Sequence, residues 1–139
     1  MAQATLLDAN VLSELLRPNG DPRVAAFVRS LANPLVSAVV FHELAYGVEM
    51  MPAGIKRARL SSGVEAFRNR FRERTIPVDV EVAEIAGRLR AGEARSGYAL
   101  DAADAFIAAS ALTAPARLAT RNVRHFERLG IELVDPWKG

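Results

Sequence analysis

Carboxylate and amide side chains recur where short apolar stretches of this sequence end. Asp8 and Asn10 follow the first such stretch, and Glu43 lies one helical turn beyond the second. Asn122 comes just after a later stretch. In a parallel α/β fold the carboxyl ends of the strands share one edge of the sheet, and ligands bind at that edge. The spacing therefore predicts that these side chains meet there.

An acidic pair opens an alanine-rich segment further along the chain. Asp101 and Asp104 are three residues apart and so share a face of the helix expected over residues 103–112. The neighbours of Asp104 are alanine, phenylalanine and isoleucine, so most of this helix is expected to be buried, apart from the end that carries Asp104. This acid therefore favours a functional role at the same edge of the sheet.

Converging carboxylates indicate a metal site. Carboxylates that share a small volume repel one another and raise each other's pKa, unless a cation lies between them. Oxygen ligands without thiolate and with little histidine point to Mg²⁺ or Mn²⁺ rather than zinc. Such an ion polarises a phosphate and lowers the pKa of a bound water, which suits hydrolysis of phosphodiesters.

Each of these residues also has a structural alternative. Aspartate is a common helix N-cap, so Asp8 and Asp101 could each simply begin a helix, and Asp101 is interpreted first as a cap. Asn122 is typical of a turn or cap. Glu43 is harder to explain in this way, because an acid among apolar neighbours on a helix needs a partner.

Strands and helices alternate in the pattern that would position these residues. Proline, glycine and asparagine clusters separate short apolar runs from segments with helical spacing. The alternation predicts an α/β fold, a three-layer α/β/α sandwich around a mostly parallel sheet. Strands are expected at 5–7, 35–37, 76–78, 117–119 and 131–134. Helices are expected at 10–16, 22–31, 39–51, 56–72, 103–112 and 123–129, and one more begins at 79 and continues beyond 89.

Length and composition narrow the class of protein. The chain has 139 residues, enough for a single domain over residues 1–139 with a proper core. It has no cysteine, which excludes disulfides and thiolate metal sites and fits a reducing compartment. No signal peptide is recognised, and the apolar runs are too short to span a bilayer. A soluble, cytoplasmic protein without membrane contact is expected.

Arginine clusters form a candidate surface for binding nucleic acid. Sixteen of the eighteen basic residues are arginine, whose planar fork suits phosphate better than a lysine ammonium does. The helix expected over 56–72 carries an apolar stripe with arginines opposite, among them Arg68, Arg70 and Arg72. Arg121 belongs to a later cluster. An ordinary solvated helix face is the alternative for these charges.

Four sequence blocks together resemble the PIN-domain family, and within it the VapC-type toxins of type II toxin–antitoxin modules. The first block runs from Leu6 to Glu14, with an acid-x-asparagine pattern after the first strand. The second, from Ser37 to Val48, contains Glu-Leu-x-x-Gly. The third runs from Asp104 to Ala111, and the fourth from Ala119 to Phe126. Each is a weak motif alone, but their order and spacing are specific.

The resemblance implies a metal-dependent endoribonuclease. Asp8, Glu43 and Asp104 would form the acidic core around Mg²⁺ (or Mn²⁺), with Asp8 and Asp104 as direct ligands. Glu43 would be a ligand or, through water, a general base, and Asn10 would orient Asp8 or a metal-bound water. Asp101 and Asn122 would support the site. Arg68, Arg70, Arg72 and Arg121 are the candidates to bind the RNA backbone.

The resemblance also implies partners. A VapB-type antitoxin would wrap the toxin with its C-terminal tail and cover the acidic site, often with an arginine that reaches the carboxylates. A homodimer is expected, which would form a higher assembly with antitoxin and contact operator DNA only through the antitoxin.

The fourth block departs from the family pattern. Many relatives have an acid at the position of Asn122, and often another where His125 stands. An asparagine oxygen can still face a metal or its water, but it brings no charge, so one tightly held ion is predicted in the free protein. His42 and His125 lack ligand-like spacing and are expected to make surface or local hydrogen bonds.

Three other classes of α/β protein do not fit these residues. A receiver domain needs a lysine after its fifth strand, but the only lysines are Lys56 and Lys138. A haloacid dehalogenase phosphatase needs an acid where Asn10 stands, and a nucleotide-binding domain needs a glycine-rich loop that is absent. The alternative that remains is a PIN-fold binding module with weak catalysis, which Asn122 favours and the retained acids oppose.

Overall fold

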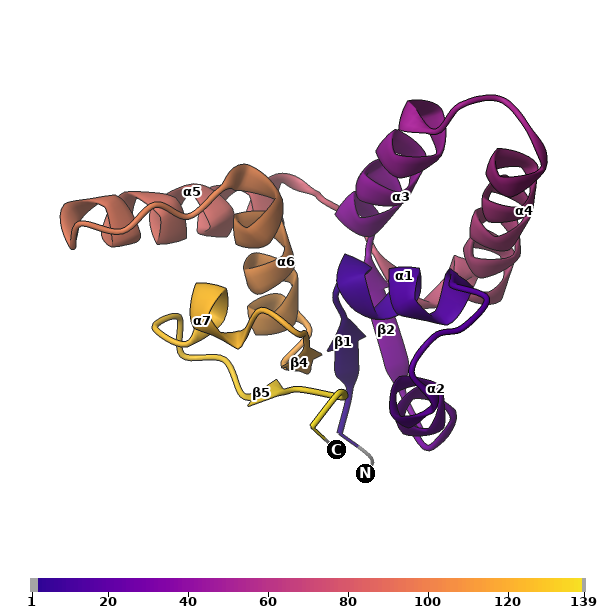
Figure 1. The fold of residues 1–139 in the computed structure, drawn as a ribbon. Coiled ribbons are helices and arrows are strands. Elements are labelled where there is room, and N and C mark those ends of the chain that lie inside the picture. The colour runs from indigo at the N-terminus through magenta and orange to yellow at the C-terminus, as the bar shows by residue number, and fades with distance from the viewer. Residues whose placement is uncertain (1–2, 139) are drawn as a thin grey trace.

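A parallel sheet forms the centre of the protein in the computed structural model, which describes residues 3–138 (Figure 1). These residues form five strands and seven α-helices. The bounds are β1 Thr5–Leu7, α1 Ala9–Leu16, α2 Pro22–Arg29, β2 Pro34–Ser37, α3 Ala38–Met50, α4 Ile55–Arg70, β3 Thr75–Ile76, α5 Val80–Arg95, α6 Ala102–Thr113, β4 Arg117–Ala119, α7 Val123–Phe126 and β5 Leu133–Val134, with a 3₁₀ turn at Arg72–Arg74.

The strand order creates a crevice at one point of the sheet. The order is β3-β2-β1-β4-β5, and all four pairings are parallel. The chain moves outward from β1 to β3, then crosses back to β4 on the other side of β1. Since parallel crossovers are right-handed, α1 to α4 lie on one side of the sheet and α5 to α7 on the other, where α6 and α7 contact the strands. The α/β/α prediction is confirmed, and β1 and β4 flank the point where the strand order reverses.

The predicted elements differ from the observed ones mainly at their ends. The outermost strands β3 and β5 are each two residues long, shorter than predicted. Edge strands pair on one side only, and Pro77 has no N–H with which to continue β3. Helix α2 ends at Arg29 rather than 31, and α7 at Phe126 rather than 129. None of these shifts moves a candidate site residue to another edge of the sheet.

Two apolar clusters hold the layers together. The main cluster lies around the sheet and includes Leu6, Leu118 and Phe71, each fully buried. A smaller cluster joins α5 to α6 through side chains such as Val82 and Ala109. Figure 1 shows α5 extending away from the sheet, and α6 is the element it chiefly contacts. We call this pair the α5–α6 arm: α6 packs against the sheet, α5 projects from it, and the first turn of α6 carries Asp104.

Helix caps already place two of the acids. Asp8 begins α1, and its carboxylate accepts the Ala9 N–H at 2.7 Å. Asp101 begins α6 and accepts the Asp104 N–H at 2.8 Å. Both cap interpretations are thus confirmed. Within residues 3–138, no helix has the length and apolar character needed to cross a membrane.

Candidate active site

An acidic hollow opens at the carboxyl edge of β1 and β4, where the strand order reverses. Its volume is about 230 Å³. The three predicted core acids line it together with both predicted asparagines and Asp101, so six of the sequence-predicted residues share one site. The polar lining residues are Asp8, Asn10, Glu43, Asp101, Asp104 and Asn122.

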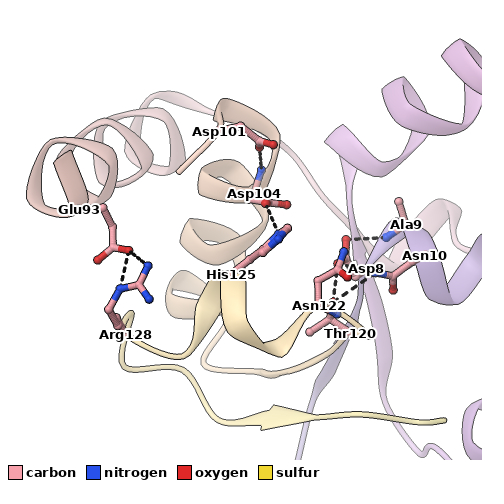
Figure 2. Close-up of polar contacts among 10 residues, drawn as sticks. All are labelled: Asp8, Ala9, Asn10, Glu93, Asp101, Asp104, Thr120, Asn122, His125 and Arg128. Carbon is pink, nitrogen blue, oxygen red and sulfur yellow. Dashed lines mark hydrogen bonds and ion pairs between the residues drawn. The ribbon is translucent and has the colours of Figure 1, made fainter. Parts of the chain in front are cut away.

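Asp8 is the most buried and most firmly held of these acids. It is 5 % exposed, and its backbone N–H donates to the Ala119 carbonyl across the β1–β4 pair. Its Oδ2 atom accepts the Thr120 hydroxyl at 2.7 Å and the Asn10 amide at 3.4 Å (Figure 2). These donors leave the Asp8 carboxylate little freedom to rotate.

Thr120 connects the two strand ends. Its side chain is fully buried, and its hydroxyl oxygen accepts the backbone N–H of Asn122 at 3.0 Å while donating to Asp8. Asn10 closes the network, because its amide lies 3.4 Å from the Thr120 hydroxyl and its Oδ1 accepts the Arg121 N–H. The predicted role of Asn10 as a residue that orients Asp8 has a geometric basis here.

Burial and mutual repulsion disfavour the charge of Asp8. Burial raises the pKa of its carboxyl above the ordinary value of 3.8, and the Glu43 charge adds to the rise. The hydrogen bonds from Thr120 and Ala9 and the His125 ring oppose this effect. The net rise means that a positive charge at this place would stabilise the ionised carboxylate.

Asp104 faces the same hollow with fewer restraints. Burial, followed by the charges of Asp101 and Asp8, raises the pKa of its carboxyl from 3.8 to about 6. His125 opposes it, since its Nδ1 lies 3.1 Å from Asp104 Oδ2 (Figure 2). His125 makes the predicted local hydrogen bond, but its partner is a core acid.

Glu43 and Asn122 complete the lining. Glu43 lies on α3, which Ser37 caps from the end of β2, and His42 Nδ1 is 3.7 Å from Glu43 Oε1. Asn122 takes the N-cap position of α7, but its side chain makes no capping hydrogen bond. The predicted cap position of Asn122 is therefore confirmed, but its side chain does not make the cap bond and lines the acidic hollow.

A hydrated divalent cation fits this donor set. The donors are carboxylate and amide oxygens, and two of the carboxyl groups have raised pKa values that a cation would lower. Among residues 3–138, no three acidic, histidine or cysteine side chains stand close enough to hold one ion together. Mg²⁺ is commonly held by one or two carboxylates and keeps several waters, and the hollow has room for them.

The predicted arginines separate into two places. Arg121 adjoins the acidic hollow and, with Arg124 and Lys138, lines a neighbouring hollow of about 380 Å³ that also includes Asn122. Arg70 and Arg72 line a different hollow beside Arg74, which bonds Asn33 and Pro34 at the start of β2. The arginines at the end of α4 therefore lie toward the amino edge of the sheet and do not join the acids.

Sequence reasoning missed two contributors to the site. Thr120 is not among the candidate residues predicted from the sequence, although a polar residue at the end of a buried strand could have indicated it. The Asp104–His125 contact had no signal in the spacing, because it joins α6 to α7 across an intervening strand.

Comparisons with known proteins agree with this geometry. The family model of the PIN domain matches residues 5–132. The chain therefore belongs to the PIN-domain family, and within it falls with the VapC-type toxins.

Individual relatives match over nearly the whole chain. The VapC ribonuclease Y4jK of Sinorhizobium fredii is 31% identical over 136 residues, covering 96% of this chain and 97% of the relative. Toxin FitB of Neisseria gonorrhoeae is 35% identical over 135 residues, covering 95% and 97%. The solved structure of FitAcB from Neisseria gonorrhoeae superposes with a TM-score of 0.87 at 34% identity and covers 96% of this chain and 98% of that one.

A DNA-bound VapBC from Salmonella typhimurium superposes with a TM-score of 0.80 at 27% identity, covering 98% of this chain and 99% of that one. The predicted family and fold are both confirmed.

Proposed function

We propose that this protein is a divalent-metal-dependent endoribonuclease, the toxin of a type II toxin–antitoxin system. The observation that carries the proposal is the acidic hollow itself, in which Asp8, Glu43 and Asp104 converge at the carboxyl edge of β1 and β4. Similarity to a VapC ribonuclease over 96% of the chain supports the reaction type. The protein would act as one PIN domain in the cytoplasm.

Asp8 and Asp104 would hold Mg²⁺ (or Mn²⁺), and when bound the ion would polarise the scissile phosphate and lower the pKa of a water. Asn10 and Thr120 fix the Asp8 carboxylate by hydrogen bonds. Glu43 would accept the proton of the attacking water, in keeping with the absence of a tight three-acid cluster within residues 3–138. The uncharged Asn122 supports a single tightly held ion.

Cleavage of total RNA tests this function without presupposing the target. Purified antitoxin-free protein is incubated with Mg²⁺ or Mn²⁺ beside an Asp8→Asn twin, and new ends are mapped. We expect metal-dependent cuts at a few positions that the twin does not make. Equal, background-level patterns from the two folded proteins would favour the alternative, a PIN-fold binding module with weak catalysis. A Mn²⁺ titration that found two comparable sites without RNA would overturn the single-ion proposal.

RNA would approach over basic surface near the hollow. Arg121 is the best-placed arginine. Its backbone N–H donates to Asn10 Oδ1, and its Cζ lies 5.0 Å from the centroid of the Trp137 ring. Arg68, Arg70 and Arg72 would contact only the more distant RNA backbone. Reversal of these three to glutamate should weaken RNA binding, lower its salt dependence and leave metal affinity unchanged, whereas unchanged binding would remove them from the RNA surface.

A VapB-type antitoxin is the proposed protein partner. Structural neighbours include FitAB and VapBC complexes, some of them bound to DNA. The antitoxin tail would cover the acidic hollow with an arginine, and the toxin homodimer would reach operator DNA only through the antitoxin. Co-expression with a short neighbouring reading frame, followed by a nuclease assay of the complex, tests this partner, and a complex that still cuts RNA at full rate would exclude occlusion.

A further inference from the structure

A second hollow adjoins the acidic one. Its volume is about 690 Å³, which lies within the range of about 300–1,000 Å³ typical of sites for small organic ligands. Asp101 and Asp104 line both hollows. A strand of RNA with a phosphate at the acidic hollow therefore places a neighbouring nucleotide here. The further lining residues used below are Arg90, Tyr98 and His125.

Tyr98 gives this hollow an aromatic wall. The residue is 48% exposed, and one face of its ring is covered by the Arg128 guanidinium, whose Cζ lies 3.5 Å from the ring centroid. Because Tyr98 also lines the hollow, the part of the ring that Arg128 leaves free borders the open volume.

Arg128 is itself fixed, so the Tyr98 ring has a rigid support. Two nitrogens of Arg128 donate to one carboxylate oxygen of Glu93, at 3.0 and 2.7 Å (Figure 2). Glu93 is 7% exposed and lies on α5, and its carbonyl accepts the Tyr98 N–H. The pair joins the α5–α6 arm to the loop after α7. An aromatic ring held in this way loses little entropy when a second flat group stacks on it.

Arg90 supplies a positive charge at the same hollow. Its Nε donates to the Leu100 carbonyl at 3.1 Å, which fixes the guanidinium beside the loop. Among residues 3–138, no acceptor is paired with its two terminal nitrogens. A guanidinium held in this way can donate to a phosphate oxygen of an RNA strand that lies beside the hollow.

We propose that this hollow holds the base of the RNA nucleotide next to the scissile phosphate, with Tyr98 as its stacking platform and Arg90 on the adjoining phosphate. The proposal rests on the endoribonuclease function proposed above and adds residues that hold the RNA strand beside the acidic hollow. Stacking on an aromatic ring suits single-stranded RNA, whose unstacked bases are free to insert. Tyr98 is thus assigned a role in binding the RNA strand rather than in the hydrolytic step, because stacking on an aromatic ring tolerates any base.

The first test compares substitutions at Tyr98 on a short single-stranded RNA that contains a mapped cut. Tyr98→Ala should lower cleavage by about 5- to 150-fold, the range that corresponds to loss of one base–aromatic stack. Tyr98→Phe keeps the ring and should cut at the wild-type rate. Tyr46→Ala is a matched control, because Tyr46 is 62% exposed on α3 and lines neither hollow.

An abasic nucleotide separates stacking from a purely structural role. The same RNA is made with the base removed on either side of the cut in turn. At one of the two positions the wild-type protein should lose the advantage that it has over Tyr98→Ala, since neither can then stack a base. If Tyr98→Ala is equally impaired on the intact and both abasic RNAs, Tyr98 only supports the fold and the proposal is wrong.

Two other outcomes would overturn the proposal in distinguishable ways. If Tyr98→Ala cuts like wild type but loses self-association or antitoxin binding, the hollow is a protein interface. If the wild-type protein cuts no RNA better than its Asp8→Asn twin, the endoribonuclease function fails first and this inference with it.

Discussion

The two sides of the acidic hollow are built differently. On the β1–β4 side, Asp8 is buried and its carboxylate accepts hydrogen bonds from Ala9, Asn10 and Thr120. On the α6–α7 side, Asp104 is partly exposed and repelled by Asp101, and within residues 3–138 its carboxylate is bonded to His125 alone. One carboxylate is held by a network across two strand ends, and the other sits at the base of a projecting arm. The comparison indicates one fixed carboxylate and one adjustable carboxylate.

Removal of either charge should have the largest effect on activity. Asp8→Asn and Asp104→Asn should each lower the cleavage rate by about 10²- to 10³-fold or more, the cost of deleting one essential electrostatic group. Because burial raises the pKa of both carboxyls, each neutral variant should also be at least as thermostable as wild type at pH 7 without metal. Cleavage assays and thermal unfolding test this pair of outcomes. A variant that kept wild-type activity would remove that acid from the site.

Thr120→Val should weaken the fixed side selectively. The substitution keeps the size of the side chain but removes the hydroxyl that bonds Asp8 and Asn122. Loss of such a supporting hydrogen bond commonly lowers metal affinity by about 10–100-fold. Thr113→Val is a matched control, since the Thr113 hydroxyl bonds only the Ser110 carbonyl within the described residues. Calorimetric titration with Mn²⁺ gives the affinities, and equal values for the two variants would contradict a role for Thr120.

The adjustable side should produce a pH dependence of stability. The pKa of Asp104 is about 6 in the folded protein against an ordinary value of 3.8, so the folded state holds the proton more tightly than the unfolded chain. The free energy of unfolding should therefore fall as pH rises from about 4 to about 6 and then level off. Solvent reduces the effect to about 1 kcal/mol. Urea unfolding of the wild-type protein without metal should show this fall in the free energy of unfolding with pH, and Asp104→Asn should lack it. Parallel pH curves for the two proteins would contradict the prediction.

His125→Gln should have the smallest effect. The ring of His125 lowers the pKa of Asp104, so its loss should raise that pKa further and move the acidic limb of the pH–rate profile upward. Glutamine retains a donor but no charge, and the rate near pH 8 should change only a few-fold, about 1 kcal/mol or less. A full pH–rate profile separates this shift from a loss of fold, which would lower the rate at every pH.

Several features of the two sides of the acidic hollow could be predicted from the sequence. Asp8 and Asp104 could be singled out because each is a polar residue beside an apolar stretch with a clear strand or helix period. The side of the sheet followed from the rule that parallel strands end at one edge. The arginine-rich face of α4 was also predicted, with Phe71 fully buried and Arg70 exposed.

The remaining features depend on contacts between distant parts of the chain. The Thr120–Asp8 hydrogen bond spans 112 residues, and no local pattern specifies it. The Glu93–Arg128 pair and the stacking of Arg128 on Tyr98 depend on how the α5–α6 arm meets the loop after α7. The position of Arg70 and Arg72 away from the acids depends on the direction in which α4 runs. Periodicity predicts the buried face of a helix but not the edge to which its end points.

The pairing of β1 with β4 also has a consequence for the synthesis of the chain. Asp8 emerges early from the ribosome, but Thr120 and Asn122 emerge near the end, after the whole α5–α6 arm. A translation product that stops before β4 lacks the central parallel pairing and cannot assemble the acidic hollow. An interrupted round of synthesis therefore releases a polypeptide without the assembled acidic hollow, and only a finished chain carries the complete site.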